Sequence, residues 1–323
     1  SECGFQSTLF REEARQMIKD CVNAKEQDVL VFCGSGATAG FIKLVHILGL
    51  HELSHVEPRS TRSTEPSVAS VAAPVTCGFP GCSRSFTDPA DLHLHQRTHR
   101  DGHYESRRAP GDVETKGTAP AHVPASEPDD RVPVVFVGPY AHHSNILPWC
   151  VGCADVVDIP ECAVGGGVDM DALRAALTRF SSRHMKIGAF TAASNVTGAI
   201  VDEDAVTRML HEHGALAVWD FAAAAPHMPI DMNPVDKVTH GKRADGTSIV
   251  SKDAIVFSPH KFVGGPGTPG VLLVKRSLMV NAVPSAPGGG TVFFVRQDGT
   301  PRYLQNPAER EEGGTPDIVG AVR

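Results

Sequence analysis

One stretch of the chain, SPHKFVGGPGTPG at residues 258–270, indicates both the fold and the chemistry. It follows an apolar run at residues 254–258 that is typical of a buried strand, and it continues into a glycine-rich loop. Lys261 therefore stands at a strand end beside residues that can hold an anion, as a lysine that forms a Schiff base does. A solvated loop lysine is the commoner fate of any single lysine, so this interpretation depends on the other strand ends.

Three further strand ends carry polar side chains that suit the same chemistry. Asp220 directly follows the apolar run 215–219, and a carboxylate held there can pair with a pyridinium nitrogen and keep it protonated. His142 follows another predicted strand, so its imidazole can lie over a planar ring. Asn195 follows a third predicted strand, and its amide could hydrogen-bond to a phenolic oxygen.

A fifth strand end carries Gly34-Ser35-Gly36-Ala37-Thr38, just before a predicted helix. Backbone N–H groups and a hydroxyl at a helix N-terminus form a ready phosphate site. Because ligands of open α/β folds bind beyond the carboxyl ends of the strands, we expect the five loops to converge at one edge of a sheet.

Strands alternate with helices along most of the chain, which indicates a layered α/β domain with a largely parallel sheet. The predicted strands are 29–33, 133–137, 156–159, 186–193, 215–219, 254–258 and 271–275, and the predicted helices are 10–22, 37–48, 170–180 and 202–213.

Composition sets limits on the class of protein. A chain of 323 residues allows about two domains, and 41% hydrophobic residues suffice for a sizeable core. A net charge of −7 and a pI of about 6.1 argue against a nucleic-acid or anionic membrane surface as partner. No apolar run reaches the roughly 18 residues that span a bilayer.

The N-terminal sequence and the cysteines bear on the compartment. The sequence starts without Met and without a basic-then-apolar signal region, so we expect a segment to precede Ser1. The eight cysteines are then predicted to be reduced thiols, in the cytoplasm or another reducing intracellular compartment.

Residues 51–131 differ in composition from the rest of the chain. They are rich in Ser, Pro, Ala, His and charge, and most of them cannot bury enough apolar surface to order themselves. We therefore predict a discontinuous domain, residues 1–50 with 132–323, interrupted by a mostly disordered insertion at 51–131.

The insertion contains the pattern Cys77-x4-Cys82-x12-His95-x3-His99, which fits a tetrahedral Zn²⁺ site. Phe86 lies between the two ligand pairs, where such fingers place their small core. Residues 77–99 thus resemble a ββα zinc finger, and the alternative is chance spacing in a His-rich linker.

Nucleic-acid binding by this finger is not expected. The base-contacting helix positions fall on Asp88, Asp91 and Leu94, and carboxylates there repel phosphate. A single finger without net charge rarely supplies enough phosphate contacts. A protein-contact or spacer role for the finger is favoured.

Taken together, the motifs outside the insertion resemble those of the class V aminotransferases, pyridoxal phosphate enzymes of fold type I that include cysteine desulfurases and selenocysteine lyases. The resemblance covers residues 1–50 and about 132–323. Its motifs, in the family's order, are GSGAT at 34–38, HHSNILPW at 142–149, SNVTG at 194–198, WDFA at 219–222, SPHKFVGGPGTPG at 258–270 and EEGGTPDIVG at 311–320.

The resemblance implies a three-layer α/β/α large domain and a role for each matching residue. Lys261 would form the internal aldimine and shuttle the α-proton, Asp220 would pair with the pyridine nitrogen, and His142 would stack on the ring. Asn195 would lie near the phenolic oxygen. The phosphate-cradling positions are Ala37, Thr38, Ser258 and His260. Thr315 matches a loop that reaches the partner subunit's phosphate, which implies a homodimer.

The chain also departs from the desulfurase pattern. Ala223 stands where desulfurases carry Gln, and Ala141 stands where they carry Glu. The family's small domain, with an arginine that grips the substrate carboxylate and a cysteine that accepts sulfur, is expected beyond Arg323.

The resemblance favours desulfuration of L-cysteine, with transamination or another β-elimination of an amino acid as the alternative within the enzyme class. A second class is an inactive homologue that works as an interaction protein through its finger. Survival of the five polar positions Thr38, His142, Asn195, Asp220 and Lys261 argues against such decay. A dinucleotide site fails because Gly34-x-Gly36-x-x-x-Gly40 is one residue off the required spacing. A P-loop fails for lack of Gly-Lys-Ser/Thr.

Overall fold

The computed structural model describes residues 2–51, 75–76, 85–86, 130, 132–152 and 154–323. The chain divides into two compact units, residues 1–56 with 123–323 and residues 57–122. In the second unit the described residues form a short antiparallel hairpin of β2 (Val75–Thr76) and β3 (Ser85–Phe86). All other elements belong to the first unit, and none of the helices described there is long and apolar enough to cross a bilayer.

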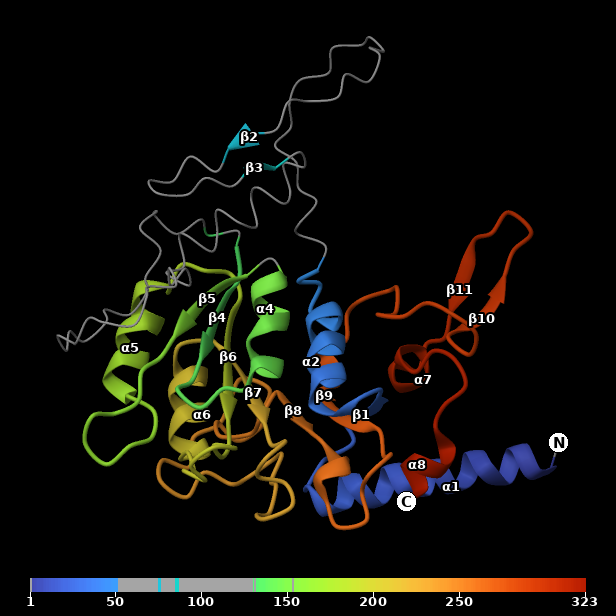
Figure 1. The fold of residues 1–323 in the computed structure, drawn as a ribbon, viewed down its shortest axis with the longest axis horizontal. Helices are drawn as coiled ribbons and strands as arrows, with labels where there is room; N and C mark the ends of the chain where they lie inside the picture. Colours follow the sequence, from blue (N-terminus) through green and yellow to red (C-terminus); the bar gives the residue numbers. More distant parts are fainter. Residues whose placement is uncertain (1, 52–74, 77–84, 87–129, 131, 153) are drawn as a thin grey trace, which may run out of the picture. The chain divides into compact units, whose positions relative to one another are not determined.

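The first unit is built on a seven-stranded sheet with the order β1-β9-β8-β7-β6-β4-β5 (Figure 1). Its strands are β1 (Asp28–Cys33), β4 (Val134–Val137), β5 (Asp155–Asp158), β6 (Lys186–Thr191), β7 (Leu216–Asp220), β8 (Ala254–Phe257) and β9 (Gly270–Lys275). Strands β5, β4, β6, β7 and β8 pair in parallel, whereas β9 is antiparallel to both β8 and β1. Six of the seven strands therefore end at the same edge.

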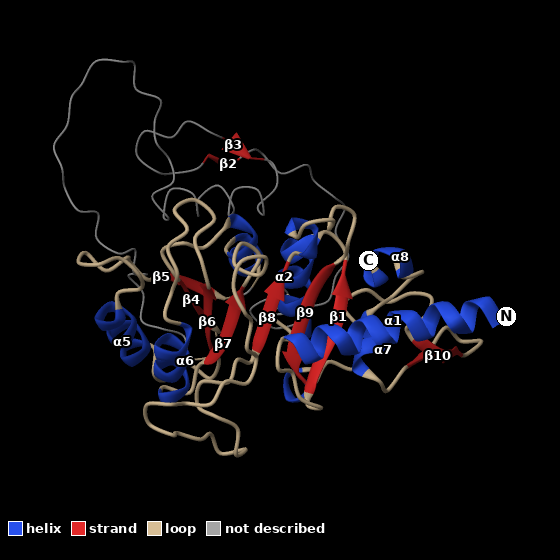
Figure 2. Ribbon diagram, turned by 90° about the horizontal axis from the view of Figure 1, so that it is seen from below, coloured by secondary structure: helices blue, strands red, loops and turns tan. Residues whose placement is uncertain are grey.

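Helices cover both faces of this sheet, because alternate strand residues point to opposite sides. On one face, residues such as Val31 and Val256 pack with α2 (Gly36–Ile47) and α4 (Leu147–Val151). On the other, residues such as Leu30 and Ile255 pack with α5 (Met170–Arg179) and α6 (Glu203–Glu212). Figure 2 shows α5 and α6 on the opposite side of the sheet from α2.

Aspartate side chains begin the two helices α5 and α6. Asp169 accepts hydrogen bonds from the N–H groups of Asp171 and Ala172, and Asp202 accepts one from Ala205 N–H. These carboxylates satisfy N–H groups that have no partner within the helix, which defines where each helix starts.

The predicted α/β fold with a large, mostly parallel sheet is confirmed, and each predicted strand overlaps an observed one. The helix predicted over 10–22 is longer than expected, since α1 runs over Glu2–Cys21. Four elements near the C-terminus were not predicted. They are β10 (Val292–Val295), β11 (Pro301–Tyr303), α7 (Pro307–Glu311) and α8 (Ile318–Val322).

Candidate active site

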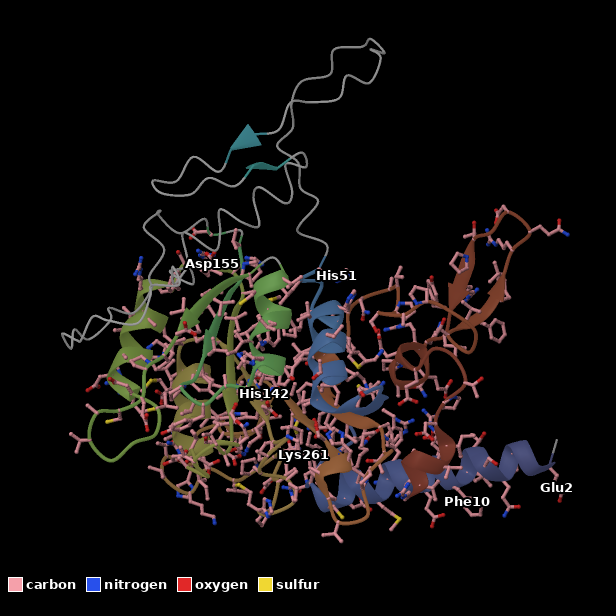
Figure 3. All side chains as sticks on the ribbon, viewed as in Figure 1. Glu2, Phe10, His51, His142, Asp155 and Lys261 are labelled. Carbon is pink, nitrogen blue, oxygen red and sulfur yellow. The ribbon has the colours of Figure 1, made fainter. Side chains whose placement is uncertain are left out.

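A cavity of about 210 Å³ lies at the carboxyl edge of the parallel strands. Segments that follow β1, β4, β6, β7 and β8 all contribute to it. Eight sequence-predicted residues line it: Ala37, Thr38, His142, Asn195, Asp220, Ser258, His260 and Lys261. His142 and Lys261, both in this lining, are labelled in Figure 3. The expected convergence of strand-end loops is thus present, and it includes Ser35 of the predicted phosphate-binding segment 34–38. Ser144 and Thr191 also line the cavity, although no role was predicted for them.

The start of α2 packs closely against the segment after β8. Ala37 N–H donates to Ser258 Oγ at 2.8 Å. Gly36 has a φ of +55°, and a Cβ there would lie 2.4 Å from His260 Cε1. Only glycine fits this approach, so two segments more than 200 residues apart in the sequence form one polar concave surface.

Hydroxyl groups connect the start of α2 to the segment after β4. Thr38 Oγ1 lies 2.7 Å from Ser144 Oγ. Ser144 N–H donates to His142 Nδ1 at 3.1 Å. Because Nδ1 accepts this hydrogen bond, the neutral His142 ring carries its proton on Nε2.

Asp220 ends β7 and is 2% exposed. Its Oδ1 accepts a hydrogen bond from Ala222 N–H at 2.8 Å. Burial raises the pKa of Asp220 to about 6, although this N–H group and the positive charge of Lys261 partly offset the effect. A buried carboxylate without a paired cation is costly, and it indicates a position where a positively charged group of a ligand is accommodated.

Lys261 lies at the end of a short 3-10 turn, Pro259–Lys261. Pro259 lacks an N–H group, so β8 cannot continue through it, and Lys261 N–H closes the turn on Ser258 O at 3.0 Å. The following Phe262 ring stacks on Phe257 of β8 with centroids 6.4 Å apart. The turn and this ring contact hold an exposed amine beside the buried carboxylate.

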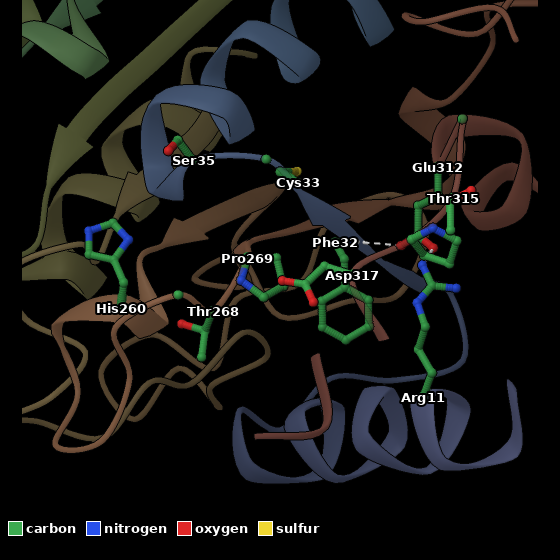
Figure 4. A pocket seen from close by; sticks show the side chains of 14 residues that line it. Arg11, Phe32, Cys33, Ser35, His260, Thr268, Pro269, Glu312, Thr315 and Asp317 are labelled. Atoms are coloured by element: carbon green, nitrogen blue, oxygen red, sulfur yellow. Dashed lines mark hydrogen bonds and ion pairs between the residues drawn. The ribbon is translucent and has the colours of Figure 1, made fainter. Parts of the chain in front are cut away.

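Thr315 does not join this group. It lies on a neighbouring cavity of about 570 Å³, shown in Figure 4 with Arg11 and Glu312. Ser35 and His260 line both cavities, which are therefore adjacent.

Glu312 anchors the loop that carries Thr315. Its carboxylate pairs with Arg11 and with Arg15 at 3.0 Å, and it accepts Phe32 N–H at 2.6 Å (Figure 4). The loop before α8 is thereby attached to both α1 and β1, a contact that sequence patterns do not reveal.

The predicted zinc ligands Cys77, Cys82, His95 and His99 lie outside the described residues. Within the part of the chain that the structure describes, no cluster of His, Cys, Asp or Glu could hold a metal ion.

Known proteins are similar to this chain in sequence and in fold. Residues 127–323 match the family described as aminotransferase class-V. A probable cysteine desulfurase of Aeropyrum pernix is 32% identical over 197 residues, which cover 58% of this chain and 42% of the relative. One of Vibrio cholerae is 32% identical over 192 residues, with the same shares.

Two solved cysteine desulfurases have a similar fold. One, from Thermococcus onnurineus, has a TM-score of 0.58 at 21% identity and covers 98% of this chain and 55% of its own. Another, from Escherichia coli, has a TM-score of 0.59 at 20% identity with the same coverage.

The fold is a layered α/β domain on a mostly parallel sheet, with a polar cavity at the carboxyl edge of its parallel strands. The chain belongs to the aminotransferase class V family, and it spans about half the length of the relatives that it matches.

The residues present fit pyridoxal phosphate. The buried Asp220 carboxylate suits a protonated pyridine nitrogen, and the Lys261 amine suits an aldehyde. The close approach of Gly36 to Ser258 and His260 leaves hydroxyl and imidazole groups beside the N-terminus of α2, where a phosphate is favoured.

Proposed function

We propose that this chain forms the cofactor-binding part of a pyridoxal-phosphate-dependent enzyme that cleaves the C–S bond of L-cysteine. The observation that carries the proposal is the single cavity in which buried Asp220 lies with Lys261 and His142. The desulfurase relatives favour this reaction over transamination and over an inactive adaptor.

When bound, pyridoxal phosphate withdraws electrons from the Cα of an amino acid and stabilises the negative charge that forms there. Asp220 would face the pyridine nitrogen. With a pKa of about 6, its carboxylate is mostly ionised at pH 7, and a positive charge beside it favours ionisation further.

The other cavity residues would hold the cofactor and move one proton. Lys261 Nζ would take the proton from the substrate Cα and return it. His142, held by Ser144 N–H, would cover one face of the ring, and Asn195 would lie near the phenolic oxygen. The phosphate would be held by Ala37 N–H, Thr38, Ser258 and His260.

The proposed reaction needs a thiol that accepts sulfur. L-cysteine and the acceptor thiol give L-alanine and the acceptor persulfide: the C–S bond breaks and an S–S bond forms. Of the two thiol protons, one ends on the methyl group of alanine and the other on the persulfide. No external oxidant is consumed.

The cofactor is tested by incubating the chain with pyridoxal phosphate, reducing with borohydride, and identifying the labelled peptide by mass. We expect label on Lys261, no label on this peptide in Lys261→Ala, and unchanged labelling in Lys237→Ala, which removes an exposed lysine outside the cavity. Absence of label in a folded parent chain would overturn the proposal. With L-cysteine and dithiothreitol, alanine and sulfide are expected, whereas keto acid without sulfide would indicate transamination.

We also propose a homodimer in which the Thr315 loop completes the phosphate site of the partner. The exposed position of Thr315 on the adjacent cavity supports this role. Sedimentation equilibrium should give twice the chain mass, and Thr315→Ala should weaken cofactor binding without dissociating the dimer.

For the insertion, we propose one Zn²⁺ bound by Cys77, Cys82, His95 and His99, in a finger that contacts another protein. The ligand spacing and the β2–β3 hairpin, which matches the strand pair of such a finger, support it. Metal analysis should find one zinc per chain, lost in Cys77→Ser and retained in Cys21→Ser. Removal of residues 56–130 should leave cofactor binding intact if 51–131 is an appendage to the domain formed by 1–50 and 132–323.

We further propose a reducing intracellular compartment. The thiols of Cys21, Cys33 and Cys162 are not in disulfides, which supports this location. Thiol titration of protein purified without reductant should find every cysteine reactive after unfolding.

A further inference from the structure

Thr191 is the last residue of β6 and lines the cavity of the candidate active site. It is only 5% exposed. Its Oγ1 is buried and has no hydrogen-bond partner among the described residues. A buried hydroxyl without a partner destabilises the folded state, so its presence in a cavity calls for an explanation.

The strand register places Thr191 next to Asp220. The two are paired residues of the parallel strands β6 and β7. Neighbouring strands lie about 4.8 Å apart, and paired residues of parallel strands point to the same face. A rotation about the Cα–Cβ bond of Thr191 would therefore be enough to bring its hydroxyl to the Asp220 carboxylate.

The groups around Asp220 leave room for such a donor. Its Oδ1 accepts a hydrogen bond from Ala222 N–H, and the positive charge of Lys261 stabilises the ionised carboxylate. The neighbouring side chains of Ala193, Ala222 and Ala223 in the cavity lining cannot donate. Thr191 is therefore the side-chain hydroxyl that the sheet itself presents to this carboxylate.

We infer that Thr191 is a positioning residue, whose hydroxyl donates a hydrogen bond to Asp220 when a protonated pyridine ring occupies the cavity. This inference rests on the proposed cofactor. The hydrogen bond holds the ionised carboxylate in the orientation that receives the ring nitrogen, so Thr191 acts on the cofactor through Asp220.

The test compares Thr191→Val, which keeps the shape and removes the hydroxyl, with Thr191→Ser, which keeps the hydroxyl. Affinity is measured in the full chain for pyridoxal phosphate and for 1-deazapyridoxal 5′-phosphate, in which a C–H replaces the ring nitrogen. Loss of one hydrogen bond to a charged group should weaken binding of pyridoxal phosphate by about tenfold or more in Thr191→Val. Thr191→Ser should restore it, and the deaza analogue should bind equally to parent and Val variant.

A second hydroxyl serves as a structural control. Thr207 Oγ1 accepts a hydrogen bond from Trp219 Nε1 at 2.9 Å. Thr207→Val should lower the midpoint of urea unfolding without changing the ratio of the two affinities. Thr191→Val should raise the midpoint of the cofactor-free chain, because it removes an unpartnered buried hydroxyl.

The outcomes separate the two proposals. Unchanged affinity for pyridoxal phosphate in Thr191→Val, or an equal loss for both ligands, would overturn the action through Asp220 while leaving the cofactor assignment intact. A parent chain that binds neither ligand would overturn the proposed function itself, and the role of Thr191 with it.

Discussion

Asp220 and Asp253 are both 2% exposed, but they lie at opposite edges of the same sheet. Asp220 ends β7 at the cavity, and Asp253 directly precedes β8 at the other edge. The Asp253 carboxylate pairs with Arg243 at 2.6 Å and His211 at 2.8 Å, and it accepts Ala217 N–H at 2.8 Å. Asp220 has one backbone N–H donor.

The different partners give the two carboxyl groups opposite pKa shifts. Burial alone would raise the pKa of both groups. At Asp253 the hydrogen bond and charge of His211 and the charge of Arg243 outweigh burial, and the pKa is lowered. At Asp220 burial prevails and the pKa rises to about 6. A buried carboxylate with all its partners stabilises the fold, whereas one without them is available to a ligand.

The largest effect is expected from Asp253→Ala. It leaves Arg243 and His211 without their carboxylate, so unfolding free energy should fall by about 3–5 kcal/mol in urea titrations. Asp171→Ala, at an exposed surface pair with Arg174, should change it by less than about 1 kcal/mol. Equal effects of the two variants would mean that the partners of Asp253 stabilise the fold no more than an exposed ion pair does.

Asp220→Asn should raise the unfolding free energy, whereas Asp253→Ala lowers it. Asn retains the acceptor for Ala222 N–H and removes the cost of ionising a buried acid. The cofactor-free chain should therefore gain roughly 2–3 kcal/mol at pH 7.5, on the order of two pKa units. Binding of pyridoxal phosphate, measured by fluorescence, should be lost. A destabilised variant would mean that Asp220 has a structural partner after all.

The pH dependence should distinguish the two aspartates. The folded pKa of Asp220 lies above its unfolded value, so its ionisation penalty is absent below about pH 4, grows up to pH 6 and is complete above it. The stability gain of Asp220→Asn should follow this window. Asp253 has a lowered pKa, so its stabilisation is complete above about pH 4 and is lost as the pH falls further. Unfolding free energies at pH 3.5, 5 and 7.5 test both windows.

The smallest effect on stability is expected from replacing one glycine at each of the two edges of the sheet. Gly36 and Gly214 have φ values of +55° and +67°, and alanine at either should cost about 1 kcal/mol of stability. Only Gly36→Ala also displaces His260 and Ser258, since nothing lies within 4 Å of a Cβ at Gly214. Gly36→Ala should thus lower the melting temperature at least as much as Gly214→Ala, and only Gly36→Ala should weaken cofactor binding. Unaltered binding in Gly36→Ala would mean that this close approach does not shape the phosphate site.

The strands were predictable because each is a short apolar run that ends in a turn signal. The direction of β9 was not, since a buried strand is equally apolar whether parallel or antiparallel. The short helices α4, α7 and α8 contain five residues each, too few to show a helical period. The sequence signal for the β10–β11 hairpin is Asp298-Gly299, a dipeptide typical of hairpin turns, between apolar and aromatic residues.

The candidate site was predictable to the extent that strand ends meet at one edge, which brings eight named residues together. Thr315 was predicted to reach the phosphate of a partner subunit, and it lies on the adjacent cavity, so its role stays a prediction. The importance of Thr191 could not be foreseen, because the lack of a partner is a property of the folded chain. The same holds for the pairing of Glu312 with Arg11, which are 301 residues apart.

The pairing of β1 with β9 determines how late in synthesis β1 can join the sheet. β1 lies at the end of the described sheet and pairs with β9, and Ala37 N–H meets Ser258. The ribosome must therefore add the residues between Cys33 and Lys275 before β1 has its partner. At about 5–20 residues per second, this wait is on the order of 10–50 s. Throughout that interval β1 presents an unpaired edge, so the nascent chain depends on its later half to protect its first strand from aggregation.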